Sequence, residues 1–237
     1  MIKTGFLLLL FFCCGCLVAQ DVGFERSTEG FVLDYLQLAG SQSALYYGKE
    51  QEGHRRTVNH PYYRDDRPAN ARLSHNQTIY PDVLLRLDMN RDELIVFSPD
   101  NRNIVLFPEN VDFAEMYGRH IVYFRGDSLP GSPPTGYYML LHSQKCKVLM
   151  RQTATLATNN TAYLGIDYHF IFSINYYLLK DGVYHNIRNK RGLLKLLEPH
   201  RRELSRFISS NKLRFRSNRE VFITQTVKEY ERLVDMQ

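Results

Sequence analysis

The stretch that decides the fold is YHFIFSINYYLLKDGVYHNI, residues 168–187. Apolar and polar side chains alternate over its first half, with one exception at Ile171. This period of two is typical of a half-buried antiparallel strand, because it places the apolar side chains on one face. Asp181-Gly182 follows, and this pair tolerates the positive φ angles of a tight turn. The stretch therefore predicts a β-hairpin whose return strand runs from Val183 to Ile187.

Further short strands are predicted upstream, at 83–89, 94–97, 104–107, 138–142 and 147–156, with turn residues between them. Aromatic residues make up 13% of the chain without any Trp, and this enrichment in Tyr and Phe also favours strands. Three prolines in the loop 126–136 exclude that loop from the sheet. We expect a mainly β (α+β) protein, with an antiparallel meander that forms a sheet, a partial barrel or a sandwich.

The period of the apolar residues changes after Asn189 and predicts two to three C-terminal helices. Leu193, Leu196 and Leu197 share one helical stripe, and Pro199 suits the first turn of a second helix. Residues 217–220, Ser-Asn-Arg-Glu, form a capping box that opens the last helix. The expected organisation is a signal peptide (1–20), a flexible lead-in (21–30), an antiparallel β domain (31–188) and a basic helical subdomain (189–237).

The N-terminus has the features of a secretory signal peptide. Lys3 precedes an apolar run to Val18, and small residues lie near the end of that run. The alternative is a lipoprotein signal in which the thiol of Cys16 is acylated. Cleavage near Gln20 leaves no transmembrane span and one cysteine, Cys146, which we expect to be an inert strand thiol although two flanking lysines could lower its pKa.

The positive charge is concentrated near the C-terminus. Residues 186–219 hold eleven Lys and Arg against two Glu. The candidate binding residues are Arg188, Lys190, Arg191, Lys195, Arg201, Arg202, Arg206, Lys212, Arg214 and Arg216. Such a patch could bind an envelope protein, an anionic lipid or an acidic polysaccharide. The alternative is that these residues are the solvated faces of amphipathic helices. Nucleic acid is excluded as a partner, because no base-reading motif is present.

Motifs for catalysis and metal binding are weak. Asp88-x-Asn90-x-Asp92 begins like a calcium loop but lacks its glycine and its final glutamate, and a hairpin turn explains the same residues. Asp167, His169 and Ser173 share one face of the strand, which is the only arrangement that suggests a hydrolase. No nucleophile elbow, phosphate loop or zinc motif accompanies them. We therefore assign no catalytic residue, no metal ligand and no cofactor.

Four Tyr-Tyr pairs occur, at 46–47, 62–63, 137–138 and 176–177. In a strand, each pair places one ring in the core and the other outside. An exposed ring could stack on a sugar, but strand-forming aromatics explain the pairs as well.

Several motifs taken in order resemble an uncharacterised family of secreted Bacteroidetes proteins. They are Gly40-Ser-x-Ser-Ala-Leu-Tyr-Tyr-Gly48, Tyr80-Pro-Asp-Val83, Arg91-Asp-Glu-Leu94 and the basic, leucine-rich tail. The resemblance implies a signal peptide, a β-rich body, a basic helical C-terminus and a place in the cell envelope, periplasmic or at the surface. It brings no activity and no catalytic residue.

The function that these patterns favour is an exported, non-enzymatic envelope protein that binds a protein partner or an anionic envelope component. The alternatives are a hydrolase acting on envelope glycans or peptides and a carrier of a small ligand.

Overall fold

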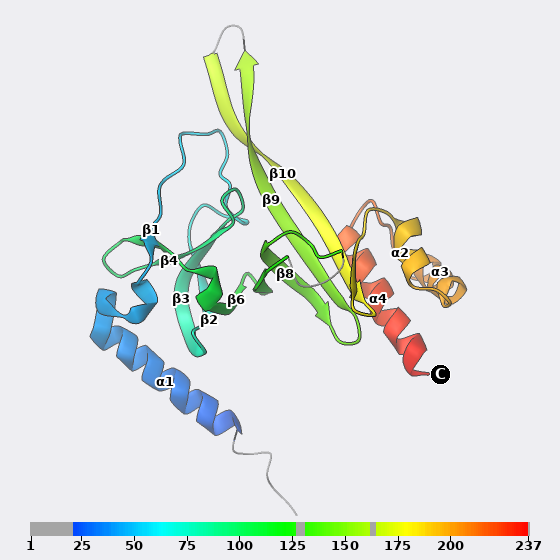
Figure 1. The fold of residues 1–237 in the computed structure, drawn as a ribbon, viewed down its shortest axis with the longest axis horizontal. Helices are drawn as coiled ribbons and strands as arrows, with labels where there is room; N and C mark the ends of the chain where they lie inside the picture. The colour runs from blue at the N-terminus through cyan, green and yellow to red at the C-terminus, as the bar shows by residue number, and fades with distance from the viewer. Residues whose placement is uncertain (1–20, 127–130, 162–164, 237) are drawn as a thin grey trace, which may run out of the picture.

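The computed structural model describes residues 21–126, 131–161 and 165–236, and side chains within these ranges except 21–27 and 159–166. The predicted signal peptide, residues 1–20, lies outside the described residues. The described residues form a mainly β fold: an eleven-stranded antiparallel sheet that does not close into a barrel, with four α-helices (Figure 1). This confirms the fold class that the alternation and turn signals predict.

The strand order in the sheet is β1-β5-β4-β3-β2-β6-β7-β8-β9-β10-β11. The strands are β1 (Lys49–Glu50), β2 (Ala69–His75), β3 (Thr78–Asp88), β4 (Glu93–Phe97), β5 (Asn103–Val105), β6 (Val111–Met116), β7 (Arg119–Phe124), β8 (Gly136–Ser143), β9 (Lys147–Thr161), β10 (Gly165–Lys180) and β11 (Val183–Asn186). Two meanders thus run outward from the central β2–β6 pair, one through β3 to β5 and the other through β7 to β11. Short 3-10 helices cover Gly40–Gln42, Ala44–Tyr46 and Pro108–Asn110.

The hairpin of β9 and β10 is the longest element and projects beyond the rest of the sheet (Figure 1). Its neighbour β11 follows the turn at Asp181-Gly182, where φ is 51° and 76°, as the hairpin signal predicts. Phe170 and Tyr176 are buried as the alternation predicts. On the same face, Phe172 and Ile174 are 42% and 43% exposed, because they line surface cavities between these two buried residues.

The expected split of the Tyr-Tyr pairs between core and solvent is wrong for two of them. Both rings are buried at 137–138 and at 176–177. The outer face of β8 to β11 is itself covered by a second small cluster, formed by Tyr138, Leu149, Tyr177 and Tyr184. Adjacent strand residues are therefore buried on both faces here.

The three C-terminal helices are α2 (Lys190–Leu196), α3 (Arg201–Ser210) and α4 (Arg219–Asp235). Helix α4 contacts β8 and α3, and α3 contacts α2. The last helix begins where the capping box predicts, but its cap differs. The Asn218 side chain, not the Ser217 hydroxyl, accepts the Val221 N–H at 3.0 Å. Glu220 pairs with Arg119 of β7 instead of capping the helix, because β7 brings a guanidinium within 2.5 Å of it.

The N-terminal part of the mature chain differs from the expectation. Residues 21–30 are not a loose lead-in, and the strands do not begin near Phe31, because Asp21–Ala39 forms one helix, α1. This helix contacts β3, and Val32 and Leu36 pack against the core from positions four apart on one helix face. Among the described residues, no helix is long and apolar enough to span a membrane.

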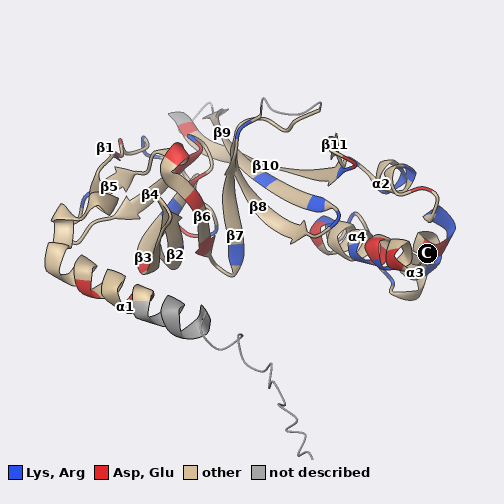
Figure 2. Ribbon diagram, turned by 60° about the horizontal axis from the view of Figure 1, so that its bottom comes forward, with Lys and Arg blue, Asp and Glu red and all other residues tan. Residues whose placement is uncertain are grey.

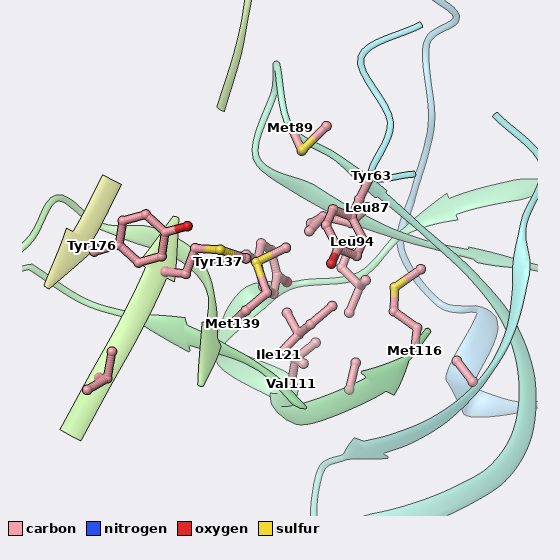
Figure 3. Close-up of a cluster of buried hydrophobic side chains, with 14 of the residues drawn as sticks. Tyr63, Leu87, Met89, Leu94, Val111, Met116, Ile121, Tyr137, Met139 and Tyr176 are labelled. Atoms are coloured by element: carbon pink, nitrogen blue, oxygen red, sulfur yellow. The ribbon is translucent and has the colours of Figure 1, made fainter. Parts of the chain in front are cut away.

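The main core lies on the inner face of the sheet. Figure 3 shows part of it, from Tyr176 across Met139 and Ile121 to Leu94. The same cluster includes Leu193, Leu204 and Phe222 of the C-terminal helices, among others, and therefore joins these helices to the sheet.

The connection from β1 to β2 ties the projecting hairpin to the body. The Asn59 side chain accepts the Phe170 N–H at 2.7 Å and donates to the Phe170 carbonyl at 2.9 Å. His54 Nε2 lies 2.5 Å from Asp88 Oδ2, at the end of β3. Arg64 also belongs to this connection.

Candidate functional site

A concave surface lies where the inner face of the hairpin meets the C-terminal helices. Its floor consists of two cross-strand pairs, Met150 opposite Tyr176 and Gln152 opposite Ile174. Residues two apart on a strand share a face, so all four side chains point to the same side. They extend the apolar core surface into a region that the core does not cover.

Four arginines line this first cavity, which has a volume of about 680 Å³. Arg119 comes from β7 and Arg64 from the β1–β2 connection, whereas Arg216 and Arg219 flank the start of α4. The helix starts here because Asn218 caps it, and this cap positions the two arginines on either side of it.

A second cavity of about 690 Å³ adjoins the first, because both are lined by Arg216 and Ser217. It adds Lys190, Arg191 and Arg214. We call the two cavities together the basic groove, lined by the seven cations Arg64, Arg119, Lys190, Arg191, Arg214, Arg216 and Arg219. Figure 2 shows Lys and Arg gathered on and around the C-terminal helices at this end of the molecule.

The basic groove has a large excess of positive charge. Among the residues that the structure describes, Glu220 is the one carboxylate that lines the two cavities, and it pairs with Arg119 at 2.5 Å. The hydrogen bond with Glu220 raises the pKa of Arg119 above its usual value. Within the described part of the chain, no ion pair involves any of the other six cations. Arg219 instead lies over the ring of Phe215, and Arg64 lies over those of Tyr63 and Tyr117.

Two of these cations also stand at an unfavourable end of a helix. The N-terminus of α4 carries a partial positive charge, which favours anions and disfavours Arg216 and Arg219 beside it. Glu220 in the first turn of α4 offsets part of this unfavourable interaction, and its carboxylate is shared with Arg119.

The structure brings together four of the ten predicted binding residues, Lys190, Arg191, Arg214 and Arg216. The other six, Arg188, Lys195, Arg201, Arg202, Arg206 and Lys212, are exposed but do not line either cavity. Arg201 lies 3.7 Å from Glu198, in an exposed pair. The predicted patch is therefore divided between the groove and the outer surface of the helices.

Sequence reasoning did not include Arg64, Arg119 or Arg219 among the binding residues. Arg219 belongs to the same basic run and could have been included on that signal. Arg64 and Arg119 have no such signal, because they come from remote segments and meet the others only in the folded chain.

Asp167, His169 and Ser173 do not form a catalytic arrangement in this structure. They follow one another along β10, where they pair with Asn159, Ala157 and Thr153 of β9. His169 and Ser173 are four residues apart, which is about 13 Å along a strand, too far for a hydrogen bond between their side chains.

The residues of the calcium-like motif make a hairpin turn. Asp88 Oδ1 accepts the N–H groups of Asn90 and Arg91, at 2.9 and 3.1 Å, and Oδ2 contacts His54. Asp92 has a φ of 59°, accepts the Tyr137 N–H and pairs with Arg151 at 3.1 Å. Each carboxylate therefore has a role in the turn.

A second buried pair joins the C-terminal helix to the sheet. His142 Nε2 lies 2.6 Å from Glu231 Oε2, and Glu231 Oε1 accepts the N–H of Cys146 at 2.6 Å. All three residues are buried. Cys146 lies in the turn between β8 and β9 and not on a strand, because Ser143 pairs with Lys147 and the three residues between them connect the two strands.

The flanking lysines do not activate Cys146. Burial, followed by the nearby Glu231 charge, raises the pKa of the thiol to about 11. At pH 8 its thiolate is therefore about a hundredfold scarcer than for an ordinary thiol.

We expect iodoacetamide to modify Cys146 in the native protein at pH 8 at least about a hundredfold more slowly than in 6 M guanidinium chloride. Mass spectrometry of timed samples measures both rates. Equal rates in the native and denatured protein would contradict the burial of the thiol.

Comparisons with known protein families, characterised proteins and solved structures find no match to this chain. The fold and the site define a mainly β protein with a basic groove between a projecting hairpin and its C-terminal helices.

Proposed function

We propose that this protein is an exported, non-enzymatic protein of the cell envelope that binds an anionic component in the basic groove. The observation that carries the proposal is the set of seven cations around two adjoining cavities, where the one carboxylate among the described lining residues is already paired. Export and the relation to secreted Bacteroidetes proteins are part of the proposal and rest on the sequence motifs.

The charge of the groove favours a ligand with several negative charges. Unpaired guanidinium groups bind carboxylate, sulfate and phosphate through charge-assisted hydrogen bonds. The concave shape lets cations from three regions of the chain contact one ligand at once, which the outer face of α3 cannot do.

The test uses tripolyphosphate as a small, multiply charged probe in isothermal titration calorimetry at low salt. Replacing Arg64, Arg216 and Arg219 by Gln is expected to weaken its binding by at least about thirtyfold. The same variant should also flatten the salt dependence of binding, because fewer cations contribute to it.

The matched control replaces Arg201, Arg202 and Arg206 of α3 by Gln. It removes the same net charge from the same basic tail, but at residues that do not line the groove. We expect less than about a threefold loss. Equal losses in the two variants would mean that the tail acts only through its total charge, and the proposed site would be wrong.

A further inference from the structure

A third cavity adjoins the basic groove. This cavity has a volume of about 280 Å³ and shares Arg64 and Gln152 with the first. It adds the side chains of His60, Tyr62 and Phe172, among others. The rings of His60 and Tyr62 are stacked, with centroids 6.0 Å apart. An aromatic surface therefore adjoins one end of the basic groove.

The floor of this path consists of apolar side chains of β10, of which Phe172 and Ile174 are exposed. Phe172, Ile174 and Tyr176 lie on the inner face of β10, at every second position. From Phe172 to Tyr176 the floor extends about 13 Å, and the second cavity lies beyond it. A single phosphate or monosaccharide would occupy only part of such a path.

We infer that the ligand of the basic groove is a linear acidic polysaccharide, whose anionic groups pair with the arginines while a sugar ring stacks on Phe172. The inference rests on the proposed function, since it names the class of ligand for the same site. A sugar chain suits both ends of the path, because its rings have apolar faces and its substituents are polar.

Two other polyanions fit less well. An acidic peptide would gain most by pairing with a strand edge, whereas the floor of the groove is the face of two strands already paired with each other. An anionic lipid would need an enclosed apolar site for its chains, whereas all three cavities are open to solvent.

The experiment compares oligogalacturonates of two, four and eight units with tripolyphosphate, an octaglutamate peptide and phosphatidylglycerol vesicles. We expect the dissociation constant of the oligogalacturonates to fall at least about tenfold from two units to eight. Phe172→Ala should weaken binding of the octamer about fivefold and leave tripolyphosphate binding unchanged.

Ile171→Ala is the matched control. Ile171 is also apolar and exposed, but it lies on the opposite face of β10 and does not line the groove. It should leave the binding of every probe unchanged.

Three results would overturn the inference while the proposed function stood: no dependence on chain length, no effect of Phe172→Ala on the octamer, or tighter binding of octaglutamate or of the vesicles. If the unmodified protein does not bind tripolyphosphate, this result would instead contradict the proposed function itself.

Discussion

Replacing Glu231 by alanine is expected to lower the free energy of unfolding by about 3 to 5 kcal/mol, because it leaves two buried hydrogen-bonding groups without their partner. The carboxylate of Glu231 contacts the His142 imidazole and accepts the Cys146 N–H, both in the interior. Its removal leaves a ring nitrogen and a backbone amide without their acceptor. Helix α4 would also lose the hydrogen bond between Glu231 and His142, which joins the last turns of the helix to β8.

Urea unfolding followed by circular dichroism measures this effect. Glu231→Gln is the second variant, because its amide oxygen can still accept the Cys146 N–H, and we expect an intermediate loss. The control is Asp235→Ala on the same helix, where the carboxylate forms an exposed ion pair with Lys145. That change should cost less than about 1 kcal/mol. Equal costs at 235 and 231 would show that the buried hydrogen bonds of Glu231 are not stabilising.

The Asp88→Ala variant is expected to lose about 3 kcal/mol of stability. The Asp88 side chain is fully buried, and its two oxygens accept or contact Asn90, Arg91 and His54. Without it, two backbone amides of the β3–β4 turn lose their acceptor. The segment that follows His54 also loses a contact with the end of β3. This segment contains His60, Tyr62 and Arg64, which line the third cavity.

The matched control for this second change is Asp100→Ala, in the next hairpin turn. Asp100 accepts from Ser98 and pairs with Arg102 at 2.9 Å, but its side chain is 42% exposed. We expect a loss below about 1 kcal/mol there. Hydrogen exchange gives a second measurement, since Asp88→Ala should weaken protection of the Val58 amide, which donates to Tyr168 of β10. Unchanged stability and protection would contradict the role of Asp88 as an anchor.

Much of the sheet could be predicted from local patterns. The alternation along β10 and the Asp181-Gly182 turn act over a few residues, so the chain itself carries the information. The start of α4 was also predicted, although the cap is Asn218. Helix α1 was missed because its apolar residues are spread around the helix, and Phe31 and Leu38 remain exposed while Val32 and Leu36 pack inward.

Part of the site could also be predicted from sequence. The basic run after residue 186 predicted a positively charged site and four of the residues that line the groove, since these residues belong to one segment of the chain. Only the tertiary structure decided which of these charges line a concave surface. The fold brings Arg64 and Arg119 to the start of α4, and no local sequence pattern predicts such distant contacts. The same holds for His142 and Glu231, which are 89 residues apart. Strand periodicity and turns are short-range steric effects that can be read from sequence, whereas a groove forms only when the packing of the core brings remote side chains together.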